Sequence, residues 1–436
     1  MEIVLTLLCT AAFSYVVFKN KFFSTEGISA KTSVLLFNLK VAAGIALALI
    51  YTFYYTDRSL ADIYKYFDDG QIIANLFLTD PLTYFQIVSG IHTDTPEVQA
   101  ILNSMRHWYK VYESPLYNDN RTIIRFNAIA HLISFGSIGV HTVIMAFLSY
   151  TGLLALYKFS KTYVKGKDHE LILVIFLLPS VIFWGSGVLK EGILLFAMGS
   201  VLYLWDKLLK DSFNWKRLIL FFFAVWLLAL SKMYVFLALA GPMIAFSWIA
   251  LTGEKKVVLK YGIVASVCII IVLILNGVLP DRGVFGMIAE KQKDFINLAI
   301  EFEVNSYYEI PVLEPNIWSF LKAAPIAFFN VLARPHLLEA GNAMMLAAAL
   351  ENLLILSLML LFIIFSKKNL EKWNFLFFCI GFVVILFTLI GMITPILGAV
   401  VRYKIPGLPL ILIACLYMFD KEKFIAKFPV FKFLNR

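Results

Sequence analysis

Long apolar runs recur along nearly the whole chain. Each is close to the roughly 20 residues that a helix needs to cross the hydrocarbon core of a bilayer. Short polar connections separate most of the runs, and no internal repeat or low-complexity linker is visible. The pattern predicts an all-α fold, a polytopic transmembrane helical bundle of about 11 spans. The expected spans are residues 2–18, 33–54, 137–157, 171–187, 191–205, 218–230, 234–251, 257–278, 343–365, 374–394 and 402–419.

The composition also indicates lipid as the solvent. Hydrophobic residues make up 61% of the 436 residues, charged residues make up 15%, and the mean hydropathy is +0.82. Soluble domains are nearer half apolar, so we expect residues 1–436 to form a single integral membrane domain. The net charge of +9 is divided among short loops rather than concentrated on one surface, which argues against a nucleic-acid partner.

The charges of the connections predict an orientation. Numbering the connections alternately places the lysine-rich ones on one side, which the positive-inside rule assigns to the cytoplasm. The other side receives most of the acidic residues and two large outer loops, residues 55–136 and 279–342. We therefore expect the N-terminus outside and the C-terminus in the cytoplasm, in a bacterial inner or plasma membrane.

Both outer loops contain amphipathic stretches, which predict helices lying on the membrane surface. These stretches are residues 80–91, 95–112 and 284–303. Residues 317–333 are apolar as well, but counting them as a crossing would invert every later loop. We expect an interfacial or re-entrant helix there.

An acidic motif, Tyr66-Phe67-Asp68-Asp69-Gly70, follows the second expected span. Adjacent carboxylates at a membrane surface can act as a general base, with a pKa raised by mutual repulsion. They can also bind a hard divalent cation such as Mg²⁺ or Mn²⁺. A solvated acidic turn that ends at Gly70 is the structural alternative. We expect Asp68 or Asp69 to be the catalytic base, with both as candidate metal ligands. The sequence establishes no cofactor.

A few basic residues are expected on the outer side, against the rule that set the orientation. They are Lys190, Lys232, Arg334, Arg402 and Lys404. Cations at this depth suit a phosphate at the level of the lipid headgroups, which Arg binds bidentately and Lys as a point charge. The structural alternatives are a hairpin cap, in which Lys190 and Glu191 solvate each other, and snorkelling to lipid phosphates. We expect these five cations to bind the phosphate of a substrate.

The last expected span begins with the segment from Arg402 to Pro409, which reads Arg-Tyr-Lys-Ile-Pro-Gly-Leu-Pro. Together with Asp68-Asp69 in a large first outer loop, this segment resembles the GT-C superfamily of polytopic membrane glycosyltransferases. Those enzymes use polyprenyl-phosphate or polyprenyl-diphosphate sugars. The resemblance implies that Asp68 is a catalytic base or metal ligand with Asp69 beside it, and that Arg402 faces the phosphate of the donor lipid.

These features predict a membrane glycosyltransferase of the inverting type. It would move a sugar from a polyprenyl-phosphate-linked donor to a glycan, lipid or protein acceptor at the outer face. A polysaccharide polymerase of the O-antigen type is an alternative with similar outer arginines. A transporter or flippase of an anionic lipid or sugar ranks lower, because Lys40 is the only lysine or arginine well inside an expected span and no repeat is visible.

Overall fold

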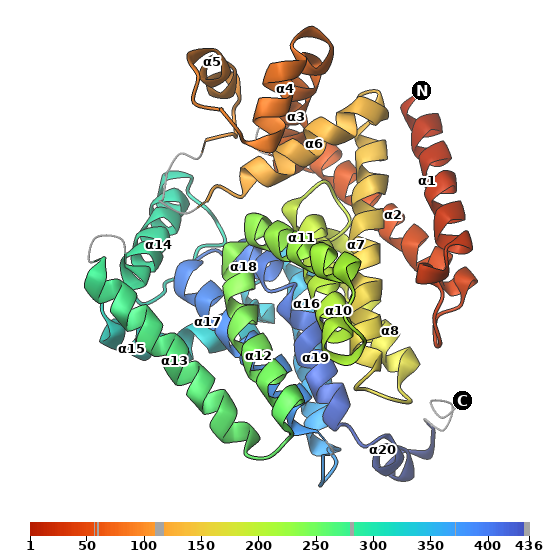
Figure 1. The fold of residues 1–436 in the computed structure, drawn as a ribbon, viewed down its shortest axis with the longest axis vertical. Helices are drawn as coiled ribbons and strands as arrows, with labels where there is room; N and C mark the ends of the chain where they lie inside the picture. The colour runs from red at the N-terminus through yellow and green to blue at the C-terminus, as the bar shows by residue number, and fades with distance from the viewer. Residues whose placement is uncertain (56, 59–60, 110–116, 280–282, 371, 431–436) are drawn as a thin grey trace. The chain divides into compact units, whose positions relative to one another are not determined.

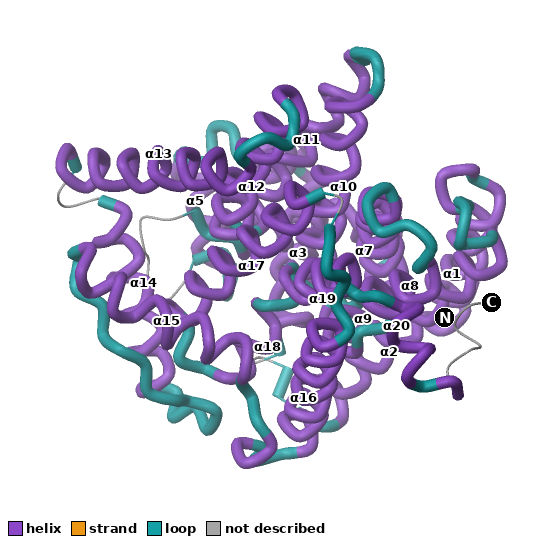
Figure 2. Tube along the Cα trace, turned by 90° about the horizontal axis from the view of Figure 1, so that it is seen from below, coloured by secondary structure: helices purple, strands orange, loops and turns teal. Residues whose placement is uncertain are grey.

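The computed structural model describes residues 1–55, 57–58, 61–109, 117–279, 283–370 and 372–430. Within these ranges the chain forms helices and loops, and only isolated bridges such as Tyr307 with Ile396 pair extended backbone. Figure 2 shows helices joined by loops with no strand in the described part of the chain. The predicted all-α fold is confirmed.

Eight of the described helices are long and apolar enough to cross a membrane. A pair bent by 59°, α18 (Leu397–Tyr403) with α19 (Gly407–Met418), brings the number to nine if the pair is one broken span. The eight are α1 (Glu2–Lys19), α2 (Ala30–Phe53), α7 (Ile138–Lys161), α10 (Lys190–Lys210), α12 (Met233–Thr252), α13 (Val257–Val278), α16 (Ala343–Ile364) and α17 (Trp373–Ile393).

The predicted number of 11 spans is not confirmed. The expected span 171–187 is two short helices, α8 (Asp168–Phe176) and α9 (Pro179–Trp184), which break where Pro179 supplies no N–H to the helix. The expected span 218–230 forms α11 (Trp215–Ser231), which has 17 residues. Residues 317–333 form α15 (Ile317–Ala333), a shorter apolar helix, so a helix is present where an interfacial or re-entrant one was expected.

The chain divides into two compact units. Unit 1 comprises residues 1–159 and 175–233, and unit 2 comprises residues 160–174 and 234–436. The sequence predicted a single domain and contained no signal for this division, because the connections between the units carry no linker-like composition. Each unit is described here by itself.

Unit 1 begins with α1 and α2, which pack together as a hairpin (Figure 1). The first expected outer loop then supplies α3 (Asp62–Thr79), α4 (Pro81–Ser89), α5 (Pro96–Ser104) and α6 (Asn120–Ser134). Helices α4 and α5 form within the stretches expected at 80–91 and 95–112, but α5 ends at Ser104, and residues 110–112 lie outside the described residues. Gly70 lets α3 approach α6 closely, since a Cβ atom there would lie 2.6 Å from Asn127 Cβ.

The two ends of unit 1 differ in charge. Helices α10 and α11 are joined by a four-residue connection and pack side by side, so Lys190 and Lys232 lie at one end and the basic residues Lys207 to Arg217 at the other. The turn after α1 lies at that basic end too, because the Phe22 ring packs 6.2 Å from the ring of Tyr203. The end that carries Lys190 and Lys232 is thus opposite the lysine-rich connections of unit 1.

Unit 2 is built around α17, which packs against α15 and α19. Its remaining helices are α14 (Val284–Glu301), which forms where a surface helix was expected, the 3₁₀ helix η2 (Leu337–Glu339) and α20 (Lys421–Lys427). The segment between α14 and α15 is anchored to the start of α18. There Tyr308 N donates to Pro395 O over 2.9 Å, and the Tyr308 hydroxyl donates to Thr394 O over 3.0 Å.

Candidate functional site

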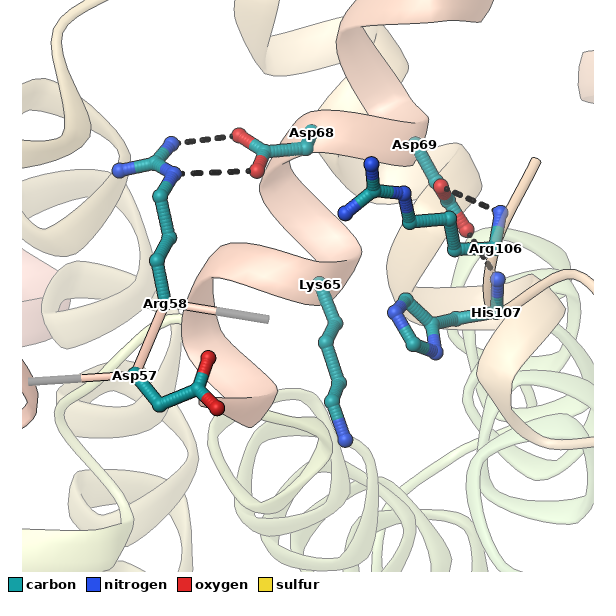
Figure 3. Close-up of a pocket in the computed structure, with 7 residues that line it drawn as sticks. All are labelled: Asp57, Arg58, Lys65, Asp68, Asp69, Arg106 and His107. Atoms are coloured by element: carbon teal, nitrogen blue, oxygen red, sulfur yellow. Dashed lines mark hydrogen bonds and ion pairs between the residues drawn. The ribbon is translucent and has the colours of Figure 1, made fainter. Parts of the chain in front are cut away.

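A charged cavity of about 350 Å³ lies in unit 1 beside the first half of α3 (Figure 3). Residues from three segments line it: the connection after α2, the helix α3, and the segment after α5. The lining residues are Asp57, Arg58, Lys65, Asp68, Asp69, Arg106 and His107. The cavity therefore contains the whole predicted acidic pair together with cations that the sequence did not single out.

The acidic pair lies inside a helix, so the alternative of a solvated turn ending at Gly70 was wrong. Adjacent residues on an α-helix point about 100° apart. Asp68 and Asp69 accordingly face different sides of α3, as Figure 3 shows, and contact different partners. They do not act as a paired carboxylate.

Asp68 is the accessible carboxylate of the cavity. Arg58 approaches it bidentately, with Nη2 2.5 Å from Oδ1 and Nε 3.2 Å from Oδ2. The guanidinium also lies 4.1 Å from the centre of the Tyr64 ring, which fixes its position. The side chains of Arg58 and Asp68 are 55% and 47% exposed, so both remain open to an incoming molecule.

Asp69 is buried, and its carboxylate binds backbone N–H groups of the segment after α5. Its two carboxylate oxygens accept the N–H groups of Arg106, over 3.1 Å, and His107, over 2.8 Å. Burial raises the pKa of Asp69, and the two N–H groups oppose the rise. Repulsion from Asp68, the cause that the sequence suggested, is smaller than these effects. With both oxygens occupied and the side chain out of water, Asp69 positions the 106–107 segment.

The remaining lining residues give the cavity both acidic and basic side chains. Lys65 and Arg106 also line it, the first from α3 and the second from the segment after α5 (Figure 3). Burial and the neighbouring Lys65 lower the pKa of His107 to about 4, so its imidazole is neutral at pH 7. The basic side chains that line the cavity besides His107 are Arg58, Lys65 and Arg106.

Lys190 and Lys232 converge on one carboxylate, Asp119, which the sequence did not identify. Lys232 Nζ lies 2.7 Å and Lys190 Nζ 3.1 Å from the same oxygen, Oδ2. Lys190 also donates to Asn120 Oδ1 over 2.8 Å. All three charged side chains are at most 15% exposed. The structural alternative of a hairpin cap, in which Lys190 and Glu191 merely solvate each other, does not describe this buried cluster.

Asn120 connects the lysine cluster to the cavity. Its Nδ2 donates to His107 O over 3.2 Å, and its Oδ1 accepts the hydroxyl of Tyr66 over 3.3 Å. The backbone of His107 is therefore held on one side by Asp69 and on the other by Asn120. The only sequence signal for this role is the polar run Asn118-Asp119-Asn120, which leads into the first residue of α6.

Lys404, Arg334 and Arg402 belong to unit 2. Lys404 is buried, and its ammonium donates to Val331 O over 3.2 Å, Arg334 O over 2.9 Å and Asn352 Oδ1 over 2.8 Å. A phosphate on Lys404 would have to displace one of these acceptors. Arg334 Nε lies 3.1 Å from Glu339 Oε1. Arg402 is half-buried near the end of α18.

No group of three or more His, Cys, Asp or Glu side chains suited to a metal ion occurs among the described residues. Asp68 and Asp69 stay candidate ligands from the sequence alone. Because their carboxylates diverge, Asp68 and Asp69 do not present a joint metal site in this structure.

A scan against protein-family models finds no match, and searches of curated proteins and of solved structures find no significant match either.

Proposed function

We propose that the chain is a membrane glycosyltransferase whose reaction takes place at the cavity beside α3. It would transfer a sugar from a polyprenyl-phosphate-linked donor to a glycan, lipid or protein acceptor, with inversion at the anomeric carbon. The observation that carries the proposal is an accessible carboxylate, Asp68, set among the cations Arg58, Lys65 and Arg106 in one cavity. The resemblance of the acidic motif and of the segment beginning at Arg402 to GT-C enzymes supports the same reading.

The proposed reaction assigns each group a part. The oxygen of the acceptor hydroxyl bonds to the anomeric carbon, and Asp68 accepts the proton that this hydroxyl loses. The bond from that carbon to the donor phosphate breaks, and the phosphate leaves with the electron pair. Lys65 and Arg106 stabilise the negative charge that grows on the leaving phosphate. Asp69 acts only through the backbone of Arg106 and His107, as a positioning residue.

The location of the cavity supports action at the outer face. Helix α2, one of the eight long apolar helices, ends at Phe53, and the cavity residues Asp57 and Arg58 follow directly. Lys190, which is linked to the cavity through Asn120, lies at the end of unit 1 opposite the basic connections. The positive-inside rule assigns those basic connections to the cytoplasm, so the cavity would face the other side, with the N-terminus outside.

The experiment compares Asp68→Asn, Asp69→Asn and the matched control Asp94→Asn, an exposed acid of the same outer loop. Each variant is reconstituted in liposomes with a panel of labelled polyprenyl-phosphate sugars, and transfer is followed by the release of polyprenyl phosphate. Asp68→Asn is expected to lower kcat by about 100-fold or more with an unchanged unfolding temperature, and Asp94→Asn to change neither. Full activity of Asp68→Asn contradicts the proposal.

The products separate the proposal from its alternatives. A transferase adds one sugar per acceptor, whereas a polymerase of the O-antigen type extends a diphosphate-linked repeat into long chains. A transporter or flippase moves labelled lipid across the bilayer without releasing polyprenyl phosphate. Release of polyprenyl phosphate together with a product larger by one sugar is the result expected here.

A further inference from the structure

A second cavity, of about 770 Å³, lies within unit 2 where three connections between helices meet. These are the connection between α7 and α8, the connection between α16 and α17, and the segment between α19 and α20. Five of the lining residues are lysines and two are acidic. The lysines are Lys167, Lys367, Lys368, Lys421 and Lys423.

The walls of this cavity are held by backbone hydrogen bonds. Lys367 N donates to Met418 O over 2.8 Å, and Asp420 N donates to Phe365 O over 2.7 Å. The buried ammonium of Lys167 donates to the carbonyls of Leu416 and Phe419 at the end of α19. The lysines therefore project from a defined frame rather than from a loose loop.

Part of the charge is already neutralised within unit 2. Lys421 Nζ lies 2.8 Å from Glu170 Oε1. Lys367 and Lys368 are exposed and form no ion pair with a described residue. Burial lowers the pKa of Lys167 to about 8, and the positive charge of Lys367 adds to this effect. Crowding of like charge in a cavity favours a bound anion.

The position of the cavity at the end of α16 indicates which anion fits. The 22 residues of α16 span about 33 Å, close to the thickness of the hydrocarbon core. Leucine and isoleucine side chains are exposed along the helix, from Leu350 through Leu360 to Ile364. Lys367 and Lys368 follow within four residues of Ile364, at the depth where lipid headgroups would lie.

We propose that this cavity binds the phosphate headgroup of an anionic membrane lipid whose acyl chains lie along the exposed face of α16. The exposed apolar face supplies contacts that a lipid can use and that inorganic phosphate cannot. Lys367 and Lys368 contact the headgroup, and Lys167 contributes its charge from the base of the cavity. Binding here is independent of the reaction proposed for unit 1.

The test uses the full chain purified in detergent and titrated with phosphatidylglycerol or phosphatidylcholine, with bound lipid counted by native mass spectrometry. The variant is Lys367→Gln with Lys368→Gln. The matched control is Lys255→Gln with Lys256→Gln, an adjacent exposed lysine pair in another connection of unit 2 that does not line the cavity. The cavity variant is expected to bind phosphatidylglycerol about tenfold more weakly, and the control less than about twofold more weakly.

Three results would overturn the proposal. An equal loss of phosphatidylglycerol binding in the cavity variant and in the control would mean that any basic loop attracts the lipid. Unchanged binding in the cavity variant would place the lipid elsewhere. Displacement of phosphatidylglycerol by inorganic phosphate at millimolar concentration would show a site for free phosphate instead of a lipid.

Discussion

Lys232 Nζ lies 2.7 Å from Asp119 Oδ2, and this ion pair joins the residue after α11 to the residue before α6. Lys190, the first residue of α10, shares the same oxygen. Three helix ends of unit 1 thus depend on one carboxylate that water hardly reaches. Buried charges are costly without a partner, so the carboxylate and the two lysines must be present together.

Replacing Asp119 with Asn is expected to lower the free energy of unfolding by about 3 kcal/mol, because two buried ammonium groups lose their counter-charge. Denaturant unfolding of the purified protein, followed by tryptophan fluorescence, measures the change. Asp211→Asn is the control, since its pairs with Lys207 and Arg217 are about one-third exposed and worth less than about 1 kcal/mol. Similar unfolding of Asp119→Asn and the unaltered chain would show that the cluster is not stabilising.

Gly70→Ala tests the close packing of α3 on α6. The added Cβ would lie 2.6 Å from Asn127 Cβ and 3.0 Å from Ala128 N, and the latter is backbone that can move only with its helix. Overpacking of this kind costs about 1–3 kcal/mol, and here it would also shift Asp68 and Asp69 relative to their partners. Gly262→Ala is the control, because no atom lies within 4 Å of its added Cβ. A smaller loss of stability for Gly70→Ala than for Gly262→Ala would contradict the packing argument.

The sequence predicted the class of the fold well, because apolar runs report the presence of helices directly. It predicted the number of spans less well. The run 171–187 is mostly apolar, yet it forms two helices that break at Pro179, since hydropathy does not register a missing N–H. The division into two units was not predictable either, because it depends on which helix faces pack together.

For the candidate site, the sequence identified residues but not their partners. Asp68 and Asp69 were visible as an acidic pair, but the difference between them comes from their partners. Asp68 pairs with Arg58, 10 residues away in the chain, and Asp69 accepts the N–H of Arg106, 37 residues away. Asp119 was overlooked because a single Asp before a helix looks like an ordinary cap. Its role appears only when folding brings Lys190 and Lys232 to it, over separations of 71 and 113 residues.

Lys404 and Arg402 were both predicted to bind a donor phosphate, and paired variants distinguish them. Lys404→Gln is expected to destabilise the protein by about 2 kcal/mol, because three acceptors lose a charged donor. Arg402→Gln is expected to leave the unfolding temperature nearly unchanged and to weaken binding of a polyprenyl-phosphate donor about tenfold. Measuring KM and thermal unfolding for both variants checks this. Weaker donor binding in Lys404→Gln without a loss of stability would assign the phosphate to Lys404 instead.

The last prediction concerns the pH dependence of stability and rests on His107. Its pKa is about 4 in the folded chain and 6.5 in the unfolded chain, so between these values the unfolded chain binds more protons. The contribution of His107 to the free energy of unfolding should therefore have its full value above about pH 6.5 and should decrease as the pH falls toward 4.

His107→Gln removes this contribution, so its unfolding midpoint should decline less between pH 7 and pH 4.5 than that of the unaltered chain. His169→Gln, an exposed histidine of α8, serves as the control and should decline as the unaltered chain does. Because His107 is only partly buried, water reduces the size of the effect. Parallel pH curves for His107→Gln and the unaltered chain would mean that the imidazole near Lys65 is as easily protonated in the folded state as in the unfolded one.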